Sequence, residues 1–331
     1  MEQLTSQRLL TLLLLGLAAA LLVLVVPEAR LPTITRTVML AGAAMSLNLL
    51  IGNAGLVSMG HGLFLGLGAY VVAVGNIKHN VSLAWCMLAA VLASLVVAAI
   101  SGIIALRARA LFFALLTLAL GQVAFVFVAR NYALTGGDDG LVGVNVPAWL
   151  DGDLPQHLLA VAATTAVCVV LLVLLASPFG AVLRALRDNS ERVASLGGNP
   201  KLYEMIAFVI AGVLGGIMGI VAALTDQAVE PTLISWTTGA TLLVMVALGG
   251  RFTFLGPIAG VVILELTRSY VQMHSSHADL FVGLLVVVCA IAFPEGIGPR
   301  IQNSSLGRWF KRASASSSRA EISDAERESQ A

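Results

Sequence analysis

The chain has 331 residues, of which 58% are hydrophobic and only 11% are charged, and its formal net charge is +1. Soluble domains carry about 25% charged residues, so this composition excludes an ordinary soluble protein. The near-zero net charge gives no reason to expect a nucleic-acid partner. Cys86, Cys168 and Cys289 lie far apart within apolar stretches, which favours small core residues over disulfides or metal ligands.

Ten apolar runs approach or reach the roughly 17–25 residues that a bilayer-spanning helix needs. They are residues 9–26, 35–51, 56–77, 83–106, 110–130, 157–177, 205–225, 235–250, 254–272 and 279–294. The first is followed by a poor cleavage site and is expected to be an uncleaved anchor. The eighth is short and contains Gly239, so a partial or tilted span is expected. The sequence thus predicts an all-α integral membrane protein with about ten transmembrane helices.

The distribution of cations predicts how these spans are oriented. Arginine and lysine concentrate in the turn at 107–109, in the loop at 178–203 and after residue 299. The loops at 131–156 and 226–234 carry acids and no lysine or arginine. Ten crossings place the three basic segments on the cytoplasmic side together with both termini. Arg30, Arg36 and Lys78 are exceptions on the outer side.

Two regions of the chain are expected to differ in order. Residues 1–302 form the predicted transmembrane domain. Residues 303–331 are rich in serine and charge and nearly free of bulky apolar side chains. Such a segment cannot bury enough surface to fold, so a disordered cytoplasmic tail is predicted.

The apolar run at residues 46–70 is repeatedly interrupted by glycines and polar residues. Lipid offers no hydrogen-bond partners, so backbone at bilayer depth must be satisfied internally or line a cavity enclosed by protein. A broken, Gly-rich segment is therefore typical of a transport pathway, although tight helix packing through small residues uses glycine equally. The candidate pathway residues are Asn48, Ser58, Gly60 and His61. A satisfied packing histidine is the competing interpretation of His61.

The loop at 178–203 predicts a short amphipathic helix between two spans. Apolar residues at 182, 183, 186, 193 and 196 approximate one helical face, and charged residues occupy the rest. Gly197 and Pro200 then end the helix, while Ser190 is a second possible start. Such a helix suits docking into a groove on another protein, or else lying on anionic lipid.

Motifs for enzymatic chemistry are missing from the sequence. It contains no His-Glu-x-x-His, no Gly-x-Ser-x-Gly and no phosphate-binding loop of the form Gly-x-x-x-x-Gly-Lys. We therefore expect a transport subunit rather than an enzyme, with no cofactor and no metal site. The alternative is a carrier or channel for small polar solutes such as urea, driven by an ion gradient.

Four segments in fixed order resemble one family. They are residues 46–70, residues 134–141, the loop at 179–197, and Ala247–Gly250 through Leu255–Pro257. Together they resemble the permease subunits of ABC importers for branched-chain amino acids, the LivM type. The resemblance covers roughly residues 36–300 and implies a bacterial inner-membrane protein. The implied partners are a second permease subunit, two ATP-binding cassette subunits, a periplasmic substrate-binding protein and membrane lipid.

The resemblance also implies roles for two loops. The inner loop is similar to the segment that couples ABC importers to their ATPases. Its pattern is Glu-Ala-Ala, three residues, then Gly; Glu191 and Gly197 keep the spacing, whereas Arg192 and Val193 replace the alanines. The implied coupling residues are Arg184, Arg187, Glu191 and Gly197. The implied docking turn for the binding protein is Thr135, Gly136, Gly137, Asp138 and Asp139, and an ordinary polar turn is its alternative.

Overall fold

The computed structural model describes residues 2–21, 27, 30–274, 280, 283–284 and 296. Most of this chain is helical, because a helix satisfies its own backbone hydrogen bonds in a solvent that offers none. The long helices are α1 (Glu2–Leu21), α2 (Leu31–Asn48), α3 (Gly62–Ala73), α4 (Leu83–Ala105), α5 (Leu111–Arg130), α7 (Asp153–Ala176), α10 (Pro200–Asp226), α11 (Trp236–Gly249) and α12 (Gly256–His274). Two of them continue as π-helices, α2 into η3 (Leu49–Ala54) and α3 into η4 (Val74–Lys78).

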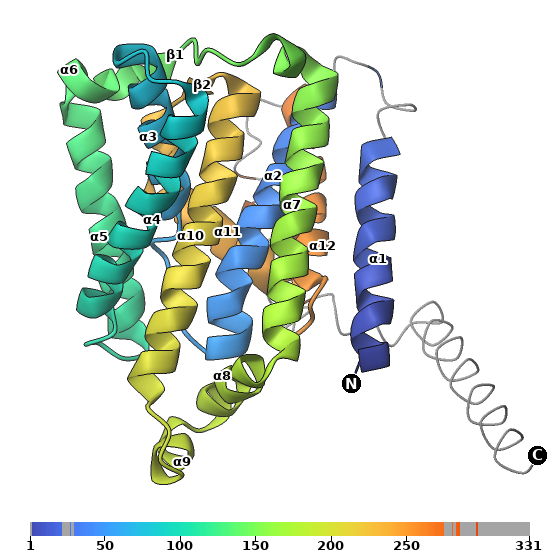
Figure 1. The fold of residues 1–331 in the computed structure, drawn as a ribbon, viewed down its shortest axis with the longest axis vertical. Helices are drawn as coiled ribbons and strands as arrows, with labels where there is room; N and C mark the ends of the chain where they lie inside the picture. The colour runs from blue at the N-terminus through green and yellow to red at the C-terminus, as the bar shows by residue number, and fades with distance from the viewer. Residues whose placement is uncertain are drawn as a thin grey trace, which may run out of the picture.

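Short elements occupy both ends of the bundle. At one end lie α8 (Pro178–Asp188) and α9 (Ser190–Ser195), beside the start of α1 (Figure 1). At the other end lie α6 (Tyr132–Thr135), η5 (Gly137–Asp139), η6 (Ala148–Leu150), η7 (Pro231–Leu233), β1 (Leu141–Val142) and β2 (Ala228–Val229). The two strands pair antiparallel, Leu141 opposite Val229 and Val142 opposite Ala228. The acidic loops predicted to share one side are thus joined in one small sheet, opposite the basic loop.

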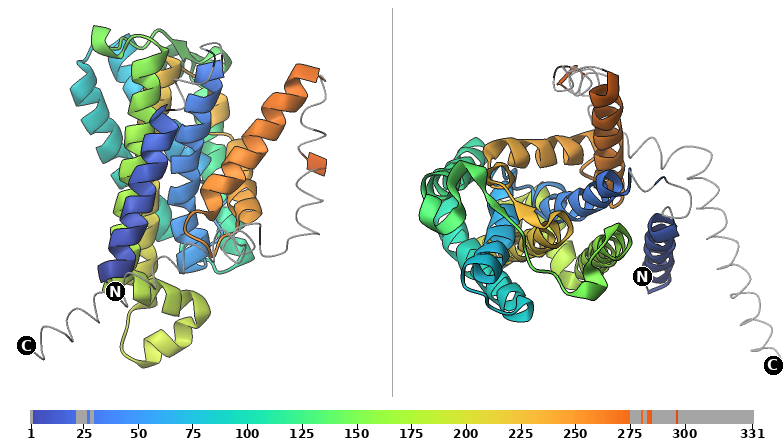
Figure 2. Two further views of the ribbon diagram at one scale, coloured as in Figure 1. Left: turned by 90° about the vertical axis from the view of Figure 1, so that its right-hand side faces the viewer. Right: turned by 90° about the horizontal axis from the view of Figure 1, so that it is seen from above.

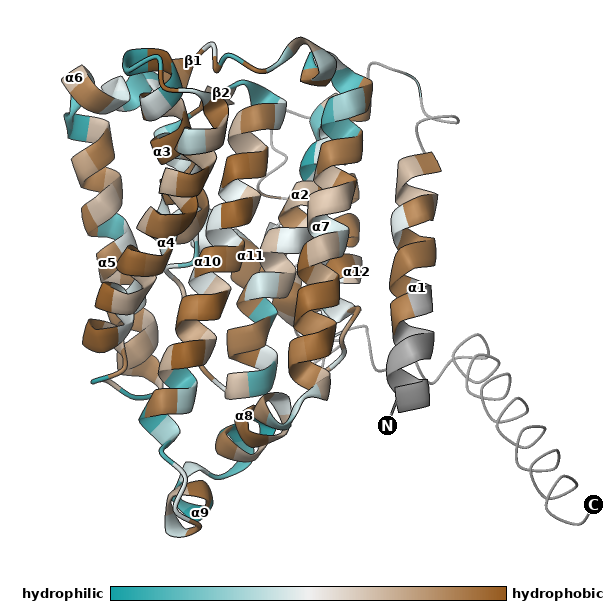
Figure 3. Ribbon diagram, in the orientation of Figure 1, coloured by the Kyte–Doolittle hydropathy of each residue, from teal (hydrophilic) through white to brown (hydrophobic). Residues whose placement is uncertain are grey.

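The bundle is arranged around α2 and α10. Helix α10 packs against α2, α3, α4 and α7, and α2 also packs against α7 and α12. Helix α1 lies at the periphery against α7 (Figure 2). The lateral faces of the helices are mainly hydrophobic, and polar residues gather towards the two ends (Figure 3). This distribution fits a multi-pass membrane protein.

Five helices of the described chain are long and apolar enough to cross a membrane: Leu31–Ala54, Leu83–Ala105, Leu111–Arg130, Asp153–Ala176 and Pro200–Asp226. The predicted helix at 56–77 is wrong at its start, because residues 55–61 are not helical and α3 begins at Gly62. Helix α11 has 14 residues, so it is short, as expected for 235–250. At 1.5 Å per residue it covers about 21 Å of a core about 30 Å thick.

Several predictions fall on residues beyond those described. The proposed tail at 303–331 lies outside them, as do Cys289 and nearly all of the tenth predicted span. Cys86 and Cys168 are buried and unpaired, as their apolar setting predicts.

Small residues bring α3 and α10 into close contact. A β-carbon at Gly68 would overlap the backbone carbonyl of Gly216 on α10, and one at Gly219 would overlap the carbonyl of Leu65. Nearby, Phe64, Phe208 and Phe113 form successive edge-to-face pairs, with ring centroids 5.6 and 6.0 Å apart. In this part of the 46–70 segment, glycine serves helix packing.

Candidate functional site

The first interruption of the bundle follows α2 and η3. Gly55 ends η3 with φ +74°, a left-handed conformation that glycine adopts without steric cost. The amide of Leu56 donates to the Leu50 carbonyl at 2.9 Å, which closes this end of the helix. The chain is then irregular through His61, with a bend at Met59, before α3 begins. The predicted break in 46–70 therefore lies at residues 55–61.

A second interruption precedes α11. After β2, the chain passes through η7, and the Ser235 side chain caps the new helix by accepting a hydrogen bond from the amide of Thr237 at 3.2 Å. The first interruption packs on the start of α11, because a β-carbon at Gly239 would overlap the carbonyl of Met59. Gly60 in turn lies against the carbonyl of Thr117 on α5. The non-helical backbone at residues 59–60 thus packs directly on two helices.

The predicted pathway residues are buried around the first interruption. Ser58 and His61 are fully buried and Asn48 is 4% exposed. Their polar groups are incompletely satisfied: Asn48 Oδ1, Ser58 Oγ and His61 Nδ1 have no hydrogen-bond partner within the described chain. Buried polar atoms are normally paired with protein or water, so three unpaired atoms around one break are unusual.

Ser46 fixes the orientation of His61. The Ser46 hydroxyl donates to the Ala43 carbonyl at 2.7 Å, and His61 Nε2 lies 2.8 Å from Ser46 Oγ. Because the hydroxyl hydrogen of Ser46 is used in the bond to Ala43, Ser46 Oγ accepts a hydrogen bond from Nε2–H of His61. In the neutral imidazole Nδ1 is then a bare acceptor. One ring nitrogen of His61 is thus hydrogen-bonded to a neighbouring helix, and the other has no partner in the described chain.

Sequence reasoning missed two residues of this region. Ser46 orients His61, and Thr117 Oγ1 accepts a hydrogen bond from the Met59 amide at 3.2 Å. Each is an isolated hydroxyl within an apolar run. Such residues usually bond back to their own helix, so their type and position alone gave no signal.

The inner loop forms two helices rather than the single helix predicted. Asn189 separates α8 from α9, and its side chain accepts from the Arg192 amide at 2.9 Å. The cap is thus Asn189 and not Ser190. Gly197 ends α9 with φ +85°, and Pro200 opens α10, as the sequence indicated. Glu191 and Gly197 are exposed at the tip of the loop (Figure 1).

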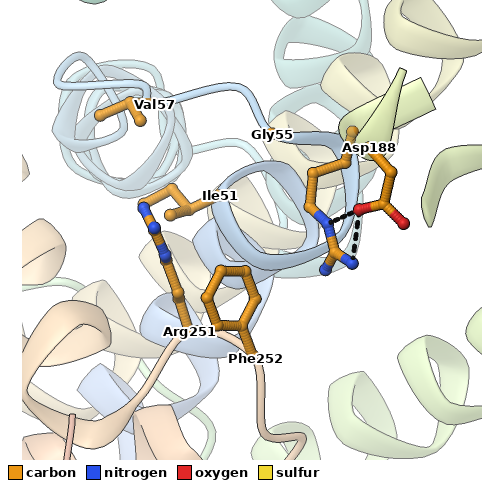
Figure 4. Close-up of a pocket in the computed structure, with 7 residues that line it drawn as sticks. Ile51, Gly55, Val57, Asp188, Arg251 and Phe252 are labelled. Carbon is orange, nitrogen blue, oxygen red and sulfur yellow. Dashed lines mark hydrogen bonds and ion pairs between the residues drawn. The ribbon is translucent and has the colours of Figure 1, made fainter. Parts of the chain in front are cut away.

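The arginines of α8 face different surroundings. Arg184 is exposed and donates to the Leu175 carbonyl at 3.1 Å. Arg187 is half-buried beside a cavity of about 390 Å³ lined by Ile51, Gly55, Val57, Arg187, Asp188, Arg251 and Phe252 (Figure 4). The implied coupling residues are therefore split between the solvent-facing tip and the junction of α8 with the bundle.

The acidic turn at the opposite end is tightly built. Thr135 is buried, and its hydroxyl lies 2.6 Å from the Val128 carbonyl and 2.7 Å from the Asn131 carbonyl. Gly136 and Gly137 are buried with positive φ, while Asp138 and Asp139 are exposed. Only the two aspartates of this set present side chains outward. The three sets of predicted residues thus occupy three separate places: the interior, the α8–α9 end and the β1–β2 end.

Comparisons with known proteins place this arrangement in a family. A family model described as "Branched-chain amino acid transport system / permease component" matches residues 30–291. The chain belongs to this family. The matched range contains both interruptions, α8, α9 and the acidic turn, whereas α1 precedes it.

The chain is also similar in sequence to individual members of the branched-chain permease family. The chain is 25% identical to the high-affinity branched-chain amino acid transport system permease protein LivM of Salmonella typhimurium, over 80% of this chain and 69% of that protein. It is 26% identical to the LivM protein of Escherichia coli, over 77% and 66%. A probable LivM of Methanocaldococcus jannaschii is 24% identical over half of each chain. No solved structure matches significantly.

No group of three or more His, Cys, Asp or Glu side chains that could hold a metal ion occurs in the described ranges. The family that the chain matches is described as a transport permease component.

Proposed function

We propose that the chain is the permease subunit of an ABC importer that moves branched-chain or related amino acids into the cytoplasm. ATP hydrolysis in partner subunits drives the movement. The observation that carries the proposal is the helix interruption at 55–61, surrounded by buried polar atoms without partners and packed on the start of α11, in a chain of the branched-chain permease family.

The unpaired atoms favour a solute that donates hydrogen bonds. Asn48 Oδ1 and His61 Nδ1 are acceptors, and Ser58 Oγ can accept or donate. An amino acid carries an ammonium group with three donors. Asn48, Ser58 and His61, with Gly60 keeping the backbone close, are the proposed contacts of the translocation pathway.

The proposed assembly contains a second permease subunit and two ATP-binding cassette subunits docked on α8 and α9. A periplasmic substrate-binding protein docks on the turn formed by Thr135, Gly136, Gly137, Asp138 and Asp139. The complex resides in the bacterial inner membrane, with both termini of the chain cytoplasmic. Arg184, Arg187, Glu191 and Gly197 belong to the coupling loop.

The mechanism is alternating access. Closure of the ATP-binding subunits moves α8 and α9, and the bundle rearranges where its helices are interrupted. Nucleotide must supply the difference in binding free energy between the two conformations of the transporter. A solute that binds both conformations equally does not shift the equilibrium between them.

The test is uptake of labelled leucine into proteoliposomes that contain the chain, the second permease, the ATP-binding subunits and the binding protein. Uptake should require ATP. The variants Glu191→Ala and Gly197→Ala should insert normally yet lose most uptake, because both residues lie at the exposed tip rather than in the core. Uptake by the chain alone, driven by a sodium or proton gradient, would instead support an ion-coupled carrier for solutes such as urea.

A further inference from the structure

Arg187 points into the bundle rather than towards solvent. Its Nη1 donates to the carbonyl of Gly52 at 2.6 Å, across 135 positions of sequence. Asp188 holds the same guanidinium, with its Oδ1 3.0 Å from Nε and 2.9 Å from Nη2. The side chain of Arg187 is 25% exposed. Of the two arginines in α8, it is therefore the one that joins the helix to the interrupted segment.

Gly52 is suited to receive this bond. It lies in η3, where the last carbonyls have no amide of a following turn to accept from. A cation at this position also complements the negative end of the helix dipole. Gly55 leaves room for the arginine, because a β-carbon there would lie 3.0 Å from Arg187 Cγ. The π-helical end of α2 is thus capped by a side chain from another element.

The loop before α12 meets the same point. A β-carbon at Gly52 would overlap the carbonyl of Arg251. The Phe252 ring lies 5.1 Å from the guanidinium carbon of Arg187 and 4.6 Å from that of Arg251 (Figure 4). Helix α8, the end of η3 and the loop that follows α11 therefore converge on one glycine.

We infer that Arg187 is a positioning residue that transmits displacement of α8 to the interrupted segment at 49–61 through the carbonyl of Gly52. Asn48 lies one helical turn before Gly52, and Ser58 and His61 follow within nine residues. A shift of α8 therefore reaches the segment that carries the unpaired polar atoms through this charged hydrogen bond, beside the contact of the Arg187 stem with Gly55. This inference rests on the proposed function, since α8 is moved by the ATP-binding subunits.

The test uses the complete reconstituted transporter with three variants. Arg187→Met keeps the stem that packs on Gly55 and removes the donors, and Arg187→Lys keeps one charged donor. Arg107→Met is the matched control, because Arg107 is an exposed arginine in the turn between α4 and α5, outside the coupling loop. For Arg187→Met we expect ATP hydrolysis within about twofold of wild type, but leucine transported per ATP reduced about tenfold, the range expected for a charged hydrogen bond. Arg187→Lys should recover part of the loss, and Arg107→Met should resemble wild type.

A second measurement separates transmission from general damage. Hydrogen exchange at 49–60 should respond to a non-hydrolysable ATP analogue in wild type and in Arg107→Met. In Arg187→Met the response should vanish at 49–60 but persist at 178–195. If 49–60 still respond in Arg187→Met, or if transport per ATP is unchanged, the inference is overturned. If wild type shows the exchange pattern but takes up no leucine, the proposed function fails and the transmission through Arg187 stands.

Discussion

Three buried side chains near the first interruption carry polar atoms that nothing in the described chain satisfies. A buried unpaired donor or acceptor costs about 1–3 kcal/mol. Asn48, Ser58 and His61 together impose such a cost three times within 14 residues. We attribute the cost to the solute contacts under the proposed function, because a binding site must keep partners free for its ligand.

Ser58 allows this trade between stability and transport to be measured. Ser58→Ala removes the unpaired hydroxyl, so the free energy of unfolding should stay equal or rise by about 1 kcal/mol. Leucine uptake should fall several-fold. Thermal unfolding in detergent and uptake in proteoliposomes measure the two effects.

Ser94 is the matched control for Ser58. It is equally buried, but its hydroxyl donates to the Ala90 carbonyl at 2.8 Å. Ser94→Ala should leave uptake near wild type and should not stabilise the protein. A Ser58→Ala variant that transports normally would remove Ser58 from the pathway.

The candidate residues could be selected from sequence because polar groups are rare and expensive in apolar runs. The residues that form hydrogen bonds in this region, Ser46 and Thr117, could not be selected in the same way. Ser46 and Thr117 are also polar residues in apolar runs, but which face they occupy depends on how α2 and α5 rotate in the bundle. Packing against other helices sets that rotation, and hydropathy does not record it.

At the scale of elements, the glycines of residues 46–70 have two uses. Gly55 and Gly60 lie in the interruption, whereas Gly68 lets α3 pack on α10. Close packing thus accounts for Gly68 and is also present at Gly60, whereas a pathway role for the interruption belongs to the proposed function.

Gly68→Ala should destabilise the bundle. Its new methyl group would meet the backbone of Gly216, which cannot move aside as a side chain could. We expect a loss of about 1–3 kcal/mol, typical of overpacking, measured by thermal unfolding in detergent.

Gly121→Ala on α5 is the comparison for Gly68→Ala. The nearest atom to a β-carbon there is 3.6 Å away, an ordinary contact. This variant should be neutral or stabilise by up to about 1 kcal/mol, because alanine is the better helix former. Equal losses from both substitutions would contradict the packing role of Gly68.

Element order and the all-α class follow from hydropathy, whereas the breaks do not. The interruption at 55–61 falls largely within the apolar run at 56–77, so hydropathy does not mark where α3 begins. The division of the inner loop at Asn189 was missed for a related reason: the apolar spacing continues across it, and only the cap geometry reveals the break.

At the scale of the whole molecule, the two ends have different chemistry. One end presents α8 and α9 with their arginines, and the other presents the exposed Asp138 and Asp139. The predicted relative sides of the loops agree with this arrangement, since both acidic loops meet in the β1–β2 sheet.

Neutralising the acidic turn should weaken docking of the binding protein. The double variant Asp138→Asn and Asp139→Asn should lower its affinity several-fold at low salt, mainly through the association rate, and the difference should shrink as salt rises. Surface-attached transporter and soluble binding protein allow both rates to be measured.

Asp151 and Asp153 provide the control for the acidic turn. They are exposed acids on the same outer connection, outside the turn. The same charge change at these two positions should have little effect if docking is local. Equal weakening would show that only the net charge of this end matters.

Helix α1 stands apart from the rest. It precedes the range that matches the permease family and packs at the edge of the bundle. His157 on α7 links it to the bundle: Nε2 lies 3.0 Å from the Ala19 carbonyl, and Nδ1 lies 3.0 Å from the Thr35 hydroxyl on α2. One side chain therefore bridges three helices.

The β1–β2 sheet also joins the acidic loop to the chain that leads into η7 and α11. Besides its two residue pairs, the amides of Gly143 and Val144 both donate to the Gln227 carbonyl, at 2.9 and 3.2 Å. Displacement of the acidic loop should therefore be passed to the start of α11, on which the interruption at 55–61 packs. Because Arg187 bonds to Gly52 from the α8 end, this segment is linked by contacts to both ends of the bundle.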